Sequence, residues 1–133
     1  MRLGFVGVSL LLFLSSSYVH AARDWAFQDV YVDDVLVYSM SGYNVVTVKM
    51  KDVGQINTGC AQTDQHHIVS YWTTGGLGSN VQTWVSLLLS AQAQKFPVNL
   101  LVEMNTCSTG AEWDAFGSPE GLGLKLFGVR VIK

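Results

Sequence analysis

The sequence contains little charge and no run of lysine or arginine. Charged residues make up 14% of the 133 residues, against about 25% in an average globular chain. Binding to nucleic acid through a basic face and docking on acidic membranes through a polybasic segment are therefore not expected, because both need clustered positive charge. The length leaves room for one domain.

Long apolar runs are also missing, except for one at the N-terminus that contributes to the mean hydropathy of +0.28. Arg2 is followed by an apolar stretch over residues 3–14, then three serines, and Ala21 and Ala22 close the segment. This pattern predicts a secretory signal peptide over residues 1–22, because the stretch is shorter than the roughly 20 residues that span a bilayer. We expect an exported protein, periplasmic or secreted, without membrane insertion. An uncleaved anchor helix is the alternative.

Cysteine is scarce, and the two residues present, Cys60 and Cys107, form no CxxC pair. Zinc and redox sites usually bring cysteines in such pairs. In an exported chain we expect one disulfide, Cys60–Cys107, closing a loop of 48 residues and stabilising the fold by roughly 3–4 kcal/mol. A reactive or metal-binding thiol is the alternative. Residues 23–133 keep ten acidic residues and seven basic ones, Arg2 being lost with the signal peptide, for a net charge of −3.

Period-two patterns and turn residues divide residues 23–133 into five expected strands and one expected helix. The strands cover residues 27–38, 46–51, 66–73, 98–105 and 122–132, with a turn over residues 41–44. The helix covers residues 79–95, with Ser79 or Asn80 as its cap. The order β-β-β-α-β-β predicts a mainly β fold, an OB-like five-stranded barrel with one helix between strands three and four. An open α+β sandwich is the alternative.

The expected helix has an apolar face about 200° wide and a second face without charge. The apolar residues are Val81, Trp84, Val85, Leu87, Leu88, Leu89 and Ala91, and the neutral face holds Gln82, Thr83, Ser86, Ser90, Ala93 and Gln94. A solvent-facing helix normally carries glutamate and lysine at such positions. The pattern therefore predicts a helix that is covered on more than one side. We expect a homo-oligomer whose interface includes Gln82, Ser86 and Ser90.

Two pairs of adjacent residues invite a catalytic or metal-binding interpretation, His66-His67 and Asp33-Asp34. Neighbouring residues on a strand point to opposite faces, so neither pair can converge on one ion or one bond. We expect the histidines to be ordinary polar residues at the edge of a strand. The aspartates are expected to mark a bulge or a solvated edge that resists pairing with another sheet.

The segment from residue 76 to residue 80, Gly-Leu-Gly-Ser-Asn, resembles a phosphate-binding turn before a helix. It lacks the third glycine of a dinucleotide-binding motif and the Lys-Ser/Thr pair of a P-loop, and the chain has no GxSxG sequence. We therefore expect no catalytic residues, no metal and no cofactor, and a binding protein in place of an enzyme. An enzyme with an unrecognised site is the alternative.

Aromatic residues are the more informative candidates for recognition. Trp25 and Phe27 lie near the start of the expected mature chain, and Trp113 and Phe116 lie in a polar segment after Cys107. Each either fills the core or stacks on a sugar ring or a partner surface, since aromatic side chains favour recognition sites.

Several features together resemble the B subunit of subtilase cytotoxin and related OB-fold binding subunits of bacterial A–B toxins. The chain opens with Ala22-Arg23-Asp24 and Phe27, and its middle carries Cys60, Trp84, Leu87-Leu88, Ala91, Phe96, Pro97-Val98 and Cys107. The resemblance implies a ring pentamer with the helix lining a central pore. It also implies binding to cell-surface glycans such as sialic acids, and a separate A subunit as partner.

The same resemblance implies a ligand site near the start of the mature chain. The glycan pocket of that family uses a serine shortly after the aspartate that matches Asp24, and Gln28 is the nearest equivalent here. With the neighbouring aromatic residue, the candidate ligand-binding residues are Asp24, Trp25 and Gln28. A monomeric periplasmic or secreted domain that binds or inhibits another protein is the alternative function.

Overall fold

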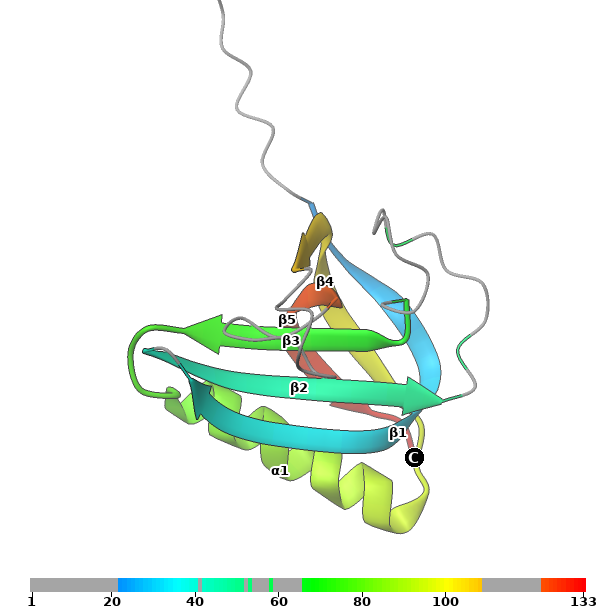
Figure 1. Ribbon diagram of the computed structural model, residues 1–133. Helices are drawn as coiled ribbons and strands as arrows, with labels where there is room; N and C mark the ends of the chain where they lie inside the picture. Colours follow the sequence, from blue (N-terminus) through cyan, green and yellow to red (C-terminus); the bar gives the residue numbers. More distant parts are fainter. Residues whose placement is uncertain (1–21, 41, 52, 54–57, 59–65, 109–122) are drawn as a thin grey trace, which may run out of the picture.

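The protein is described by a computed structural model that covers residues 22–40, 42–51, 53, 58, 66–108 and 123–133. It contains five strands and one helix in the expected order (Figure 1). Their bounds are β1 Arg23–Met40, β2 Tyr43–Lys51, β3 Ile68–Thr73, α1 Ser79–Gln94, β4 Val98–Ser108 and β5 Gly123–Val131. The expected signal peptide lies almost wholly outside the described residues.

The five strands form a closed barrel in the order β1-β2-β3-β5-β4. All neighbours are antiparallel except β3 and β5, which run parallel. The long strand β1 closes the ring because residues 23–30 pair with β4 and residues 31–40 pair with β2. The prediction of an OB-like five-stranded barrel is confirmed, and the open sandwich is wrong.

Strand β1 changes partner through irregularities in its backbone. Asp33 is an extra residue between Val32 and Asp34, which pair with consecutive positions on β2. Asp29 has a φ of 54° where the register with β4 also shifts. Such bulges bend a strand and increase its twist, which allows one strand to serve both halves of the barrel. The expectation of a bulge at Asp33-Asp34 is confirmed.

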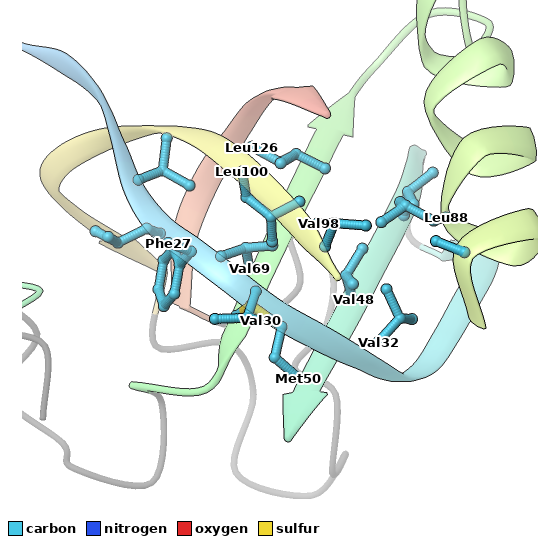
Figure 2. Packing of buried hydrophobic residues seen from close by; sticks show 14 of the residues in the cluster. Phe27, Val30, Val32, Val48, Met50, Val69, Leu88, Val98, Leu100 and Leu126 are labelled. Atoms are coloured by element: carbon cyan, nitrogen blue, oxygen red, sulfur yellow. The ribbon is translucent and has the colours of Figure 1, made fainter. Parts of the chain in front are cut away.

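The core fills the barrel interior from all five strands and is closed at one end by α1 (Figure 2). Phe27 from β1 and Leu88 from α1, both without exposed surface, lie toward opposite ends of this cluster. The helix runs along the second half of β1 (Figure 1), where the Nε2 of Gln92 donates to the carbonyl of Asp33 at 2.7 Å. Alternating apolar residues on the strands thus face one shared interior.

Two local expectations are wrong. The helix is capped by Gly78, with no side-chain hydrogen bond, in place of Ser79 or Asn80. His66 and His67 lie in a turn before β3 and not within the strand. The helix ends at Gln94, because the next residue, Lys95, adopts a left-handed conformation with φ 59°. Pro97 follows and cannot continue a helix.

Strand β4 extends three residues beyond its expected end and includes Cys107, which is disulfide-bonded. Cys60 lies outside the described residues, so its pairing with Cys107 stays a prediction. We expect mass spectrometry of the unreduced protein to find no free thiol, and a peptide linking the two cysteines after digestion. Reduction should lower the free energy of unfolding by roughly 3–4 kcal/mol. Two alkylated thiols in unreduced protein would contradict the disulfide.

Candidate functional site

The outer face of the sheet formed by β1, β4 and β5 carries an ordered set of polar and aromatic side chains. Val98, Leu100 and Val102 of β4 are fully buried in the core, so the residues between them point outward. The strand registers arrange this face as three rows across β4. We call it the β4 face, and it consists of Arg23, Trp25, Gln28, Asn99, Leu101, Glu103, Lys125, Gly128 and Arg130.

The middle row is apolar and centres on Trp25. Leu101 pairs with Gly128, and a Cβ at Gly128 would lie 3.2 Å from the Cβ of Leu101 and 3.6 Å from the Cη2 of Trp25. The absent side chain therefore leaves room for the indole to lie over β5. Trp25 remains 39% exposed, which gives the face one large aromatic surface that a ligand can reach.

The first polar row carries three charges of alternating sign. Arg23 of β1 pairs with Glu103 of β4, which in turn pairs with Lys125 of β5. The guanidinium carbon of Arg23 lies 3.7 Å from the centroid of the Phe127 ring. The Nζ of Lys125 lies 4.5 Å from the Trp72 ring centroid and 5.8 Å from that of Phe127. Aromatic rings thus fix both cations through cation–π contacts.

The second polar row lies on the other side of Trp25. Asn99 pairs with Arg130 and accepts a hydrogen bond at its Oδ1 from the backbone N–H of Asp29, 2.9 Å away. Gln28 donates from Nε2 to the backbone carbonyl of Trp25 at 3.1 Å. The Gln28 side chain therefore restrains the backbone that carries the indole. The row offers amide and guanidinium groups beside the aromatic surface.

Of the three residues expected to bind a ligand, the structure brings two together. Trp25 and Gln28 share the β4 face and a hydrogen bond. Asp24 is exposed but pairs with the buried Val102, so its side chain leaves the sheet on the opposite side. Phe27 lies entirely in the core. Trp113 and Phe116 lie outside the described residues.

Arg23, Lys125, Phe127 and Trp72 were not identified from the sequence as site residues. Lys125 and Phe127 could have been found, since they alternate along β5 with the inward-pointing Leu124 and Leu126. Arg23 could not, because its place beside Phe127 depends on the pairing of β1 with β4 and of β4 with β5.

The helix presents a second candidate surface, which we call the α1 face: Gln82, Thr83, Ser86, Leu87, Leu89, Ser90, Ala93 and Gln94. Leu87 is 36% and Leu89 is 48% exposed, at opposite borders of the face. The single chain therefore leaves part of the apolar side of the helix uncovered, and the expectation that the helix is covered on more than one side stays a prediction. Val81, Leu88 and Ala91 alone are buried on α1.

Polar groups of the α1 face are already hydrogen-bonded within the helix. The hydroxyl of Ser86 donates to the carbonyl of Gln82 at 3.0 Å. The hydroxyl of Thr83 donates to the carbonyl of Ser79 at 2.9 Å, and Gln94 donates to the Oγ of Ser90 at 2.7 Å. Since a buried polar group costs little when it keeps its hydrogen bond, this face can be covered at a small desolvation cost.

The described residues hold no group of three His, Cys, Asp or Glu side chains that could bind a metal ion. No helix among them is long and apolar enough to cross a membrane. No protein-family model matches the chain, and no curated protein or solved structure matches it either. The fold and its two surfaces therefore define the protein as an OB-like barrel with an aromatic β4 face and a neutral α1 face.

Proposed function

We propose that this chain is an exported binding subunit that recognises a cell-surface glycan or glycoprotein and assembles as a ring-like homo-oligomer, with a pentamer as the expected form. The observation that carries the proposal is the exposed indole of Trp25, seated over Gly128 between two polar rows. The resemblance to toxin B subunits supports the same function and adds a separate A subunit as a possible partner.

The composition of the β4 face supports a sugar as ligand. A pyranose ring offers an apolar face of C–H groups and an edge of hydroxyls. An indole supplies apolar area at a low cost in conformational entropy, while Gln28, Asn99 and Arg130 supply planar hydrogen-bonding groups at its border. The face thus combines the two kinds of contact that one sugar ring requires.

The composition of the α1 face supports an assembly in which this face packs against other copies of the chain. It carries no charge, its serine and threonine hydroxyls are satisfied internally, and it ends in an exposed leucine on either side. A small domain buries a lower fraction of its surface than a large one, so assembly adds apolar burial. Closed cyclic symmetry is the usual arrangement of identical subunits, and repeated weak sites gain avidity from it.

Replacing Trp25 tests the glycan proposal directly. On a glycan array, the protein comprising residues 23–133 should bind one group of related glycans, and Trp25→Ala should lower the affinity for them roughly 30-fold, as for a central aromatic contact. Gly128→Val should have a similar effect, because its side chain would displace the indole. Both variants should keep the circular dichroism spectrum of the wild type.

The matched control is Val37→Ala, which removes an exposed apolar side chain from the other half of β1 and should leave the array profile unchanged. Failure of the wild-type protein to bind any glycan, or glycan binding that survives both Trp25→Ala and Gly128→Val, would contradict the proposal. A clean monomer that captures a protein partner would favour the alternative, a monomeric binding or inhibitor domain.

A further inference from the structure

We propose that a signal peptidase cleaves this chain between Ala21 and Ala22, so that the mature protein begins at Ala22 and not at Arg23. The inference rests on the export that is part of the proposed function, and adds to it the peptide bond that is cut. It assigns residues 1–21 to the signal peptide, one residue fewer than the N-terminal pattern predicts. Two observations carry it: the place of Ala22 in the barrel and the residues that precede the bond.

The backbone of Ala22 belongs to the folded barrel. Its carbonyl accepts a hydrogen bond from the backbone N–H of Met104, 2.9 Å away. Arg23 pairs with Glu103, and Ala22 and Met104 are the next pair in that antiparallel register. The ladder between β1 and β4 therefore includes the residue that precedes the first residue of β1.

The bond between Ala22 and Arg23 lies inside this ladder. Ala22 is held by Met104, and Arg23 is held by its strand pairing and by the ring of Phe127, whose centroid lies 3.7 Å from the guanidinium carbon. A cut at this bond would remove the acceptor of the Met104 N–H, whereas a cut after Ala21 keeps it. Once the barrel has formed, hydrogen-bonded backbone is also a poor substrate for a peptidase.

The residues before the two bonds favour the same position. Signal peptidases require small side chains at the first and third positions before the cut. A cut after Ala21 places Ala21 and Val19 at these positions. A cut after Ala22 places His20 at the third position, which is larger than valine and can carry a charge. Sequence and fold therefore select the bond between Ala21 and Ala22.

The experiment is N-terminal sequencing, with intact mass, of the protein recovered from the periplasm or medium of bacterial cells that express the full chain. The wild type should begin at Ala22. Ala21→Leu should abolish normal processing and accumulate precursor, because the first position before the cut is no longer small. The matched variant Ala22→Leu should be processed like the wild type and begin at position 22.

A second matched pair tests the third position before the cut. Val19→Lys should abolish processing, because a long charged side chain replaces the small one that the peptidase requires. His20→Lys places the same side chain one residue later, at a position without that requirement, and should be processed like the wild type. If the cut followed Ala22, the effects of these two variants would be exchanged.

Amide hydrogen exchange tests the place of Ala22 in the sheet independently of export. In a protein comprising residues 22–133, the amide of Met104 should be protected. In a protein comprising residues 23–133 it should exchange roughly tenfold faster or more, because its acceptor is absent. Exchange over residues 98–102 of β4 should be the same in both proteins, which shows that the fold is kept.

A mature protein that begins at Arg23, with processing blocked by Ala22→Leu and not by Ala21→Leu, would overturn this inference and leave export intact. Equal exchange at Met104 in the two proteins would also overturn it, because Ala22 would then have no place in the ladder. A wild-type chain that is recovered only in its uncut form would contradict export itself, and with it the proposed function.

Discussion

Ser86→Glu combined with Ser90→Glu is expected to convert the assembled protein into folded monomers. Both serines are exposed on the α1 face, one helical turn apart, and we propose that this face packs against neighbouring copies. A carboxylate buried there without a partner costs about 3–5 kcal/mol, which lowers an association constant more than about a hundredfold. Because every copy carries both charges, every contact between neighbouring subunits of the ring is weakened.

Light scattering after size exclusion, at micromolar protein, measures this effect. The wild-type protein should elute as an oligomer and the double glutamate variant at the mass of one chain, with an unchanged circular dichroism spectrum. The matched control is Ser86→Ala with Ser90→Ala, which changes the same positions without charge and should remain assembled. A wild-type monomer would contradict the proposed assembly, and an oligomer that tolerates both glutamates would place the interface elsewhere.

Phe27→Ala is expected to lower the free energy of unfolding by about 3–5 kcal/mol, the usual cost of replacing a buried phenylalanine by alanine. The side chain is fully buried in the cluster that the barrel encloses, and β1 on either side of it carries irregularities in the pairing with β4. The surrounding strands are closed into a ring, so we expect them to collapse little around the cavity.

Urea unfolding followed by tryptophan fluorescence measures the loss. Val37→Ala is the control on the same strand, because Val37 is 49% exposed and a surface substitution of this kind usually changes stability by less than about 0.5 kcal/mol. A Phe27→Ala variant as stable as the control would mean that the barrel interior is packed differently from the arrangement described here.

Some features of the two candidate surfaces could be predicted from the sequence, and others could not. Trp25 was identified as an aromatic residue near the start of the expected mature chain, where it could either fill the core or serve recognition, and Gln28 and Asp24 came from the toxin resemblance. Asp24 then fell on the opposite side of β1 from Trp25, because strand neighbours alternate in direction. The absence of charge on the α1 face was readable from residues 79–94 alone, whereas the exposure of Leu87 and Leu89 was not.

The sequence by itself determined the type and order of the elements, since period-two and helical patterns are local. Gly42 and Pro97 mark a turn and the end of the helix, and the neutral helix face can likewise be read from the order of the residues. Only the tertiary structure decided that β1 pairs with both β2 and β4, and that Arg23 and Trp25 meet Phe127 and Gly128 from the other end of the chain. The physical reason is that strand register depends on bulges and on closure of the whole barrel. A shift of one residue would reverse every side chain between core and surface, so the β4 face exists only once the ring of strands is complete.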